Sequence, residues 1–235
     1  MGSAKQNLFV PNFQAIFFDY GGTLDADGIP WKEHHQSIYE SLGIRLAQKK
    51  FDQAFYAADD SLTDEGLNGF SLKETLHEQV RRVFQGLGIG GISFREKVVD
   101  IFIQDTVHKV EENKGVLEQL KTRYRMGIIS NFYGNLETIC EELGLSPFLD
   151  VIVDSRRVGV TKPHAGIFNH ALKAVGCSPA RSLMVGDSAR RDMLGARAIG
   201  MPHVLLMDPG NPGAPQTCCP GDRVIGKLAD LLEVV

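Results

Sequence analysis

The stretch "QAIFFDYGGTL" at residues 14–24 decides how this chain begins to fold. Its apolar residues run to Phe18, and a short apolar run of this kind predicts a buried β-strand. The run delivers a single carboxylate, Asp19, and the chain then turns at once through Gly21 and Gly22. An aspartate alone at the end of a buried strand is a candidate functional residue.

Strands and helices alternate over the second half of the chain. Further short apolar runs predict strands at "RMGIISN", "LDVIVDS", "RSLMVGD" and "HVLLM". The segments between them have helical patterns, several of which end at glycine. Such alternation implies a parallel sheet with helices on both faces and right-handed crossovers. We therefore predict an α/β fold with a Rossmann-like, three-layer core domain that comprises residues 1–25 and 113–235.

The block between the first strand and the alternating part has a different character, because helical patterns follow one another without a strand signal. The pattern "SLKETLHEQVRRVFQGLG" begins with a Ser71–Glu74 capping box, and "SFREKVVDIFIQDTVHKV" begins with a Ser93–Glu96 box. The segment "KGVLEQLKTR" beyond them is predicted to be a separate helix of the core. The block, residues 26–112, is predicted to be an inserted, all-helical cap domain.

Composition limits the partners of this 235-residue chain. A formal net charge of −4 gives no support for nucleic acid or an anionic membrane as a partner. No apolar run approaches the roughly 18 residues that a membrane span needs, and the N-terminus does not resemble a secretory signal. The four cysteines are predicted to be free thiols, and no role is assigned to Cys218 and Cys219. We expect a cytoplasmic protein that is a monomer or a homodimer.

Polar side chains follow four of the predicted strands. They are Asp19, then Ser130 with Asn131, then Lys162 in "GVTKP", and then Asp187 with Asp192 in "VGDSARRD". The carboxyl ends of parallel strands meet at one edge of a sheet, where ligands bind. Carboxylates are ligands that Mg²⁺ prefers, and phosphoryl transfer depends chiefly on positioning and charge neutralisation. The combined set suits one task, which is to hold a phosphoryl group and Mg²⁺.

The order of these motifs resembles that of the haloacid dehalogenase-like (HAD) superfamily, with a helical insertion of the type called a C1 cap. The motifs that carry the resemblance are "FFDYGGTL", "IISN", "VTKPHAGIF" and "LMVGDSARRDMLGARAIGMP". They cover residues 14–24 and about 115–207. The cap region shares only its helical character and its location. The resemblance implies a hydrolase, with a phosphatase acting on a small phosphorylated metabolite as the leading expectation.

The resemblance also implies roles for individual positions. Asp19 is similar to the nucleophile that forms a covalent aspartyl intermediate, and Thr23 to the residue that orients this motif. Ser130 and the Asn131 amide, with Gly22, would bind the phosphoryl oxygens. Lys162 would offset charge on the nucleophile and on the transferring group.

The implied metal site uses residues of the first and last motifs. Asp19, the backbone carbonyl of Gly21 and Asp187 would bind Mg²⁺. Asp192 would lie in the metal shell or beside it. The expected cofactor is therefore Mg²⁺.

Gly21 departs from the pattern of the family's phosphatases, which usually carry a second aspartate there as general acid and base. General acid–base catalysis contributes about 10²- to 10⁴-fold, so a phosphatase with glycine here would have slow turnover, a substrate with an easy leaving group, or an acid supplied from elsewhere. Candidates for such an acid are Asp25, Asp27, His34, His35 and His164. In the cap, Trp31, Phe55, Tyr56 and Phe70 could line the inner face.

Two other interpretations stay open at this point. Dehalogenase-like relatives lack the second aspartate but carry tyrosine at that place and use no Mg²⁺, whereas phosphonatase-like relatives carry a small residue there and need a cap lysine. Lys49 and Lys50 lie in the cap block. The third interpretation is a non-catalytic HAD-fold binding protein, and the presence of Asp19, Lys162 and Asp187 speaks against it.

Overall fold

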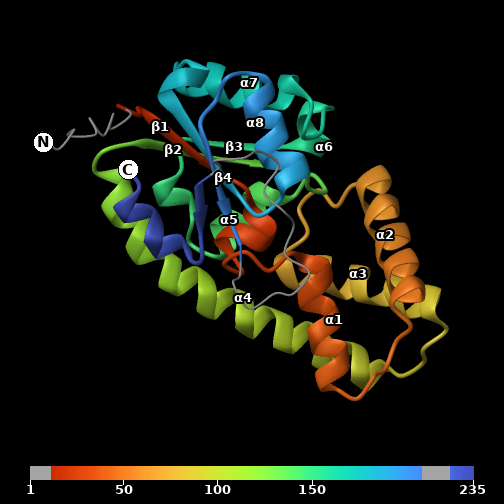
Figure 1. Ribbon diagram of the computed structural model, residues 1–235. Helices are drawn as coiled ribbons and strands as arrows, with labels where there is room; N and C mark the ends of the chain where they lie inside the picture. Colours follow the sequence, from red (N-terminus) through yellow and green to blue (C-terminus); the bar gives the residue numbers. More distant parts are fainter. Residues whose placement is uncertain (1–11, 208–222) are drawn as a thin grey trace, which may run out of the picture.

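A six-stranded, all-parallel sheet forms the centre of the molecule in the computed structural model, which describes residues 12–207 and 223–235 (Figure 1). The strand order is β3-β2-β1-β4-β5-β6. The strands are β1 (Ala15–Phe18), β2 (Arg125–Ser130), β3 (Val151–Asp154), β4 (Ser182–Gly186), β5 (His203–Leu206) and β6 (Arg223–Ile225). The predicted α/β fold with a parallel sheet is confirmed.

Alternation along β1 explains how the sheet receives a layer on each side. Successive side chains of a strand point to opposite faces. Ile16 and Phe18 belong to one buried apolar cluster, whereas Ala15 and Phe17 belong to the other. All four residues are completely buried, as expected for a central strand that is covered on both faces.

Helices cover both faces of the sheet and give the predicted three layers (Figure 1). On one face lie α7 (Ala165–Val175) and α8 (Leu194–Ala198), and on the other lie α5 (Leu136–Glu142) and the second half of α4 (Ile92–Lys121). The short helix α6 (Ser155–Val158) follows β3. Shorter turns of other helical types are Tyr20–Leu24, Ser146–Phe148, Pro179–Arg181, Ala189–Met193 and Leu228–Glu233.

The remaining helices, α1 (Trp31–Ser41), α2 (Gln48–Glu65) and α3 (Leu72–Leu87), pack with the first half of α4 beside the sheet (Figure 1). The Ser71–Glu74 capping box begins α3 as predicted. Four phenylalanines of this bundle, Phe51, Phe55, Phe84 and Phe102, are buried. They belong to the same cluster as the residues under the sheet, so the bundle and the core share apolar contacts.

The α4 helix differs from the prediction. It is one helix of 30 residues rather than two, and its N-cap, Gly91, makes no side-chain cap hydrogen bond, so the predicted Ser93–Glu96 box is wrong. The expected break coincides with Asn113, whose Nδ2 donates a hydrogen bond to the Leu24 carbonyl at 3.0 Å. Asn113 has a low helix propensity, and this hydrogen bond to a distant part of the chain stabilises it within the helix. The division into core and cap domains remains our prediction, and its boundary at 112/113 falls within α4.

Two other expectations concern cysteines and membranes. Cys140 is buried and Cys177 half-buried, both as free thiols, while Cys218 and Cys219 lie outside the described residues. None of the helices in the described part of the chain is both long and apolar enough to cross a membrane.

The helical bundle contains a completely buried histidine, His35. Its ring lies 4.6 Å from the Phe102 ring centroid, and its Nε2 lies 3.0 Å from Gln79 Oε1. Burial, helped by the neighbouring His34, lowers the pKa of His35 from 6.5 to about 3. The folded protein therefore holds this ring neutral at a pH where the unfolded chain protonates it.

We expect the free energy of unfolding to depend on pH through this histidine. Because the pKa is lower in the folded state, the stabilisation is present above pH 6.5 and is lost as the pH falls toward 3. The loss is about 1.4 kcal/mol for each pH unit in this window. Urea unfolding at pH 6 and pH 4 should show a shallower pH dependence for His35→Gln. The same substitution at the exposed His108 should leave the slope as it is, and equal slopes for His35→Gln and the natural protein would contradict the prediction.

Candidate active site

The turn after β1 presents Asp19 at the edge of the sheet. The Asp19 backbone N–H donates to the Val185 carbonyl at 2.9 Å, so the residue is fixed between β1 and β4. Its Oδ1 accepts a hydrogen bond from the Tyr20 backbone N–H at 2.8 Å. Although Asp19 is only 6% exposed, it lines a cavity.

The glycine at position 22 is required by its surroundings. Its φ is +87°, a conformation that other residues rarely adopt. A Cβ on Gly22 would also lie 2.6 Å from Asp187 Oδ2. The turn can therefore bring β1 close to Asp187 only with glycine at this place.

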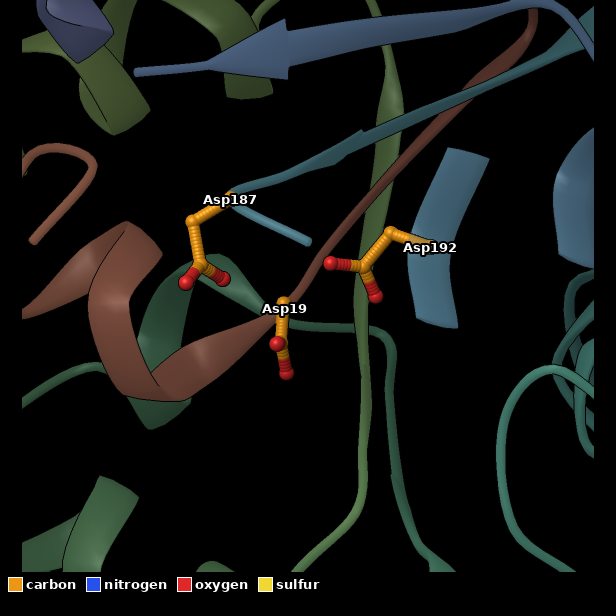
Figure 2. A group of neighbouring side chains, drawn as sticks. All are labelled: Asp19, Asp187 and Asp192. Atoms are coloured by element: carbon orange, nitrogen blue, oxygen red, sulfur yellow. The ribbon is translucent and has the colours of Figure 1, made fainter. Parts of the chain in front are cut away.

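Three aspartates converge at the ends of β1 and β4 (Figure 2). Asp19, Asp187 and Asp192 each offer an oxygen atom, and these atoms lie within 4.8 Å of one another. Burial, and next the charges of Asp19 and Asp192, raise the pKa of Asp187 well above its usual value. Thr23 Oγ1 donates to Asp187 Oδ1 at 3.4 Å. The cluster concentrates negative charge where little water reaches it.

Lys162 provides the cation in contact with this cluster. Its Nζ lies 2.8 Å from Asp19 Oδ1 and 2.6 Å from Asp192 Oδ1, and the side chain has no exposed surface. Burial by itself lowers the pKa of Lys162, but the charges of Asp19 and Asp192 outweigh burial and raise it. Lys162 Nζ also donates to the Ile129 carbonyl at 2.7 Å. The ammonium is therefore charged and fixed in position.

The residues after β2 have two different tasks. Ser130 is buried at the end of β2 and lines the cavity. The Asn131 side chain instead holds the backbone of Lys162, with Nδ2 donating to its carbonyl at 3.1 Å and Oδ1 accepting from its N–H at 2.7 Å. The side chain of Asn131 thus positions the lysine, and both its Nδ2 and its Oδ1 are engaged by the Lys162 backbone.

The place beside Gly21 is filled by an aromatic residue. A Cβ on Gly21 would lie 3.1 Å from Nε1 of Trp31, the first residue of α1. The indole N–H donates to Asp25 Oδ2 at 2.5 Å, and Asp25 Oδ1 accepts from the Gly22 N–H at 2.7 Å. Burial raises the pKa of Asp25 to about 7. Asp25 therefore fixes the positions of Trp31 and of the turn after β1, and it does not line the cavity.

A cavity of about 650 Å³ lies between the sheet edge and the helical bundle. The sheet side contributes Asp19, Gly21, Ser130, Lys162 and Asp187. The bundle contributes Trp31, Lys32 and Glu33 from α1, and Phe55, Tyr56, Asp59, Asp60 and Thr63 from α2. Its volume suits a small ligand. Asp19, Asp187 and Lys162 place charged groups on its sheet side. The arrangement can hold an anionic group against a carboxylate and a lysine while helices cover the rest of the ligand.

Comparison with known proteins identifies the family. The family model described as haloacid dehalogenase-like hydrolase matches residues 13–200. This chain belongs to the haloacid dehalogenase-like hydrolases. It is 30% identical over 232 residues to the haloacid dehalogenase-like hydrolase domain-containing protein 3 of Xenopus laevis, covering 94% of this chain and 95% of that protein.

Two other comparisons bear on the enzyme class and on the fold. A glyceraldehyde 3-phosphate phosphatase of Methanothermobacter thermautotrophicus is 42% identical over 203 residues, which cover 82% of this chain and 85% of that protein. A HAD hydrolase of Bacillus subtilis, solved with magnesium, aligns with a TM-score of 0.57 at 17% identity, covering 95% of this chain and 98% of that one. The chain is thus a hydrolase whose relatives include a phosphatase, and its fold is that of HAD hydrolases.

In this HAD hydrolase, every residue proposed from the sequence for nucleophile, phosphate or metal lies at one edge of the sheet. The cavity itself is lined by Asp19, Gly21, Ser130, Asn131, Lys162 and Asp187. Thr23, Gly22 and Asp192 lie directly behind this surface and contact Asp187, Ser188 or Lys162. Residues that follow different strands in the sequence therefore lie together in the structure.

Several residues proposed as substitute acids or cap contacts lie elsewhere. None of His34, His35, His164, Asp25 and Asp27 lines the cavity. His34 and His35 pair with Asp105 and Gln79 in the bundle, Asp27 contacts Lys109, and His164 caps α7. Lys49 and Lys50 are exposed outside the cavity, and Phe70 lines a separate cavity of about 330 Å³. These expectations are corrected, because packing inside the bundle uses the same residue types.

Asp59, Tyr133 and Arg191 are among the polar residues that line the cavity and that sequence reasoning missed. Asp59 follows Phe55 by four positions on α2, so helical spacing could have placed it on the same face. Tyr133 lies three residues after Ser130, in the loop that follows β2. Arg191 lies on the turn between Asp187 and Asp192, and the charges of Asp19, Asp192 and Asp187 raise its pKa against the effect of burial.

Proposed function

We propose that this chain is a Mg²⁺-dependent phosphatase that hydrolyses a small phosphorylated metabolite through an aspartyl-phosphate on Asp19. One observation carries the proposal. Oδ1 of Asp19 is held by Lys162 and by the Tyr20 N–H, whereas the described residues offer no hydrogen bond to Oδ2. The residue lines the cavity, so one carboxylate oxygen is available to attack a phosphorus atom placed there.

The chemistry of the donor set fits Mg²⁺. Three carboxylates within 4.8 Å repel one another, and Lys162 contacts only two of them. Mg²⁺ prefers carboxylate oxygens and water as ligands. Asp19, the Gly21 carbonyl and Asp187 would hold the ion, while both oxygens of Asp192 are engaged, by Lys162 Nζ and by the Ser188 N–H. When bound, Mg²⁺ would neutralise negative charge shared by the carboxylates and the phosphoryl oxygens.

The residues of the chain divide the work of the reaction. Asp19 would attack phosphorus, and Lys162, 2.8 Å away, would offset the charge on the carboxylate and on the phosphoryl oxygens. Ser130 and the backbone after it would hold those oxygens in place. Asn131 would act indirectly, because its side chain fixes the Lys162 backbone. Water would then release phosphate from Asp19, and the helical bundle over the cavity would limit access of bulk water.

The substrate is proposed to be a short polar phosphate ester such as glyceraldehyde 3-phosphate. The relative that is 42% identical bears the name of a phosphatase for this compound. Beyond the aspartates, the cavity is lined by polar side chains that could bind hydroxyl and carbonyl groups, including Lys32 and Thr63. A phosphate ester of an apolar alcohol would offer these side chains no hydroxyl or carbonyl group to bind.

A phosphonatase-like reaction receives less support from the cavity. It needs a neutral cap lysine that attacks an aldehyde. The lysine that the helical bundle contributes to the cavity, Lys32, lies 2.9 Å from Asp52 and 3.1 Å from Glu33. Although burial lowers the pKa of Lys32, these two partners raise it above its usual value, so the amine is protonated.

The test of the proposed function is phosphate release from 4-nitrophenyl phosphate and glyceraldehyde 3-phosphate, with Mg²⁺ and with EDTA. We expect turnover of both esters that requires Mg²⁺. If neither ester releases phosphate in a Mg²⁺-dependent reaction, the proposal is overturned. Metal-independent turnover of a 2-haloacid would instead indicate the dehalogenase-like reaction.

Asp187→Asn should separate metal binding from folding. Removing a buried carboxylate that is repelled by Asp19 and Asp192 should leave the metal-free protein as stable as the natural one or more stable. Mg²⁺ at 100 times its dissociation constant should stabilise the natural protein by about 2.7 kcal/mol but not the variant. Thermal unfolding in EDTA and in Mg²⁺ measures both effects. An equal rise in Tm with Mg²⁺ for both proteins would remove Asp187 from the metal site.

A further inference from the structure

In this hydrolase, the turn after β1 has no side chain at position 21 that could transfer a proton to the leaving group. Position 21 is glycine, and a Cβ there would already lie 3.1 Å from Trp31 Nε1. Trp31 is itself held by Asp25. Because the indole occupies the space beside Gly21, the acid and base must come from another wall of the cavity.

The ionisable groups in the cavity wall, apart from Lys162 and the aspartates of β1 and β4, are few. They are Lys32, Glu33, Tyr56, Asp59, Asp60, Tyr133, Arg190 and Arg191. The arginines and the paired Lys32 stay protonated. Burial raises the pKa of Tyr133 well above its usual value, so it cannot serve as a base near neutral pH. Tyr56 is 52% exposed, Asp60 is also exposed, and Glu33 pairs with Lys32.

Asp59 is the remaining carboxyl group in this set, and two elements hold it toward the cavity. It lies on α2 one turn after Phe55 and one turn before Thr63, and all three residues line the cavity. The Tyr133 hydroxyl donates a hydrogen bond to Asp59 Oδ1 and accepts one from Gln79 Nε2 at 3.3 Å. Tyr133 comes from the loop that follows Ser130, so the contact ties Asp59 to the phosphate end of the cavity.

We propose that Asp59, positioned by Tyr133, is the general acid and base that replaces the missing side chain at position 21. This role rests on the proposed phosphatase function. In this role, helix α2 supplies a catalytic side chain as well as part of the cavity wall.

The charges around Asp59 favour such a role. Burial raises the pKa of Asp59 above its usual value. The Tyr133 hydrogen bond and the charge of Arg191, on the turn after β4, lower the pKa of Asp59, whereas the charge of Asp60 on the same helix raises it. The net effect keeps a larger fraction of the carboxyl protonated toward neutral pH, as a general acid requires.

Two proton transfers complete the reaction. As Asp19 Oδ2 bonds to phosphorus, the bond from phosphorus to the ester oxygen breaks, and that oxygen takes the Asp59 proton to leave as an alcohol. Water then attacks the aspartyl-phosphate and gives a proton to the Asp59 carboxylate. The bond from phosphorus to Asp19 breaks, and its electron pair returns to the Asp19 carboxylate. One ester and one water yield one alcohol and one phosphate.

The experiment compares kcat/KM for esters whose leaving groups differ in basicity. The natural protein, Asp59→Asn and Asp60→Asn would be assayed with 4-nitrophenyl phosphate, phenyl phosphate and glyceraldehyde 3-phosphate in Mg²⁺. Nitrophenolate needs little protonation, whereas an alkoxide cannot leave without it. We expect Asp59→Asn to lower kcat/KM for glyceraldehyde 3-phosphate by about 10²- to 10⁴-fold. The loss on 4-nitrophenyl phosphate should be far smaller.

Asp60→Asn is the matched control, because it removes a carboxyl from the same helix and the same cavity wall. Its three rates should keep the ratios of the natural protein. Asp59→Asn keeps the side-chain volume and an oxygen that can accept from Tyr133, and circular dichroism with thermal unfolding would verify its fold. A second expected sign is a burst of one equivalent of nitrophenol from this variant, followed by slow turnover, because water attack lacks its base.

The outcomes separate this inference from the function on which it rests. If the natural protein hydrolyses the esters but Asp59→Asn loses the same factor on all three, Asp59 has a structural role and the inference is overturned. Unchanged rates for Asp59→Asn overturn it as well. If the natural protein releases no phosphate from any ester in Mg²⁺, the phosphatase function fails first, and the role of Asp59 fails with it.

Discussion

Asp19→Asn is expected to reduce ester hydrolysis by about 10⁴-fold or more, because loss of the proposed covalent nucleophile removes a complete reaction path. An amide oxygen does not attack phosphorus at a useful rate. The fold should persist, since Asn retains an oxygen that accepts from the Tyr20 N–H. Lys162 also keeps its contact with Asp192 at 2.6 Å, so no buried cation is left unpaired.

Steady-state hydrolysis of 4-nitrophenyl phosphate, together with thermal unfolding, would measure both expectations for Asp19→Asn. The control is Asp150→Asn, which changes an aspartate just before β3, at the opposite end of the strands. This aspartate pairs with Lys121 at the surface, and turnover should stay within about 2-fold, as for surface substitutions that perturb little. Retention of more than a few per cent of the activity by Asp19→Asn would exclude an aspartyl-phosphate at this position.

The location of the site could be predicted from the sequence because it follows from local patterns. Asp19, Ser130 and Asp187 each come directly after, or at the end of, a short apolar run. Parallel strands end at the same edge of a sheet, so recognising the strands was enough to bring these residues together. The strand order β3-β2-β1-β4-β5-β6 depends on contacts between distant segments, and alternation alone does not specify it.

The parts that the sequence did not reveal depend on contacts between distant residues. Trp31 fills the space beside Gly21 although ten positions separate them, and nothing in either local pattern signals this. Asp59 and Tyr133 are 74 positions apart, and each has an ordinary place in its own segment. Histidine pairs such as His34 and His35 look similar in a site and in a core. Only packing shows that these two belong to the core.

Lys162→Met should impair both catalysis and folding. Removal of a group that stabilises charge in the transition state commonly costs about 10²- to 10³-fold in kcat. The same change leaves Asp19 and Asp192 buried at 6% and 0% exposure without their counter-ion. Breaking a buried ion pair by removing one partner typically destabilises a protein by about 3–5 kcal/mol. We expect a stability loss of this order in urea unfolding at pH 7.

Lys121→Met is the matched control for burial. Lys121 Nζ lies 2.8 Å from Asp150 Oδ2, the same distance that separates Lys162 Nζ from Asp19 Oδ1. Both side chains of the Lys121 pair are about one-third exposed, and such surface pairs contribute about 0–1 kcal/mol. Lys121→Met removes one exposed ion pair, whereas Lys162→Met removes two buried ion pairs and the hydrogen bond to the Ile129 carbonyl. The difference in stability between the two variants therefore measures what the buried contacts of Lys162 contribute.

The pH dependence gives Lys162→Met a signature that a mere packing defect would lack. Burial already raises the pKa of Asp192 in the natural protein against the lowering effect of Lys162, so without the ammonium this pKa should rise further above its value in the unfolded chain. The folded variant then binds more protons than the unfolded chain, so its stability rises as the pH falls from 7 toward 5. The stability gap to the natural protein should narrow in this range, whereas a constant gap would show that the lost contacts of Lys162 are apolar rather than ionic.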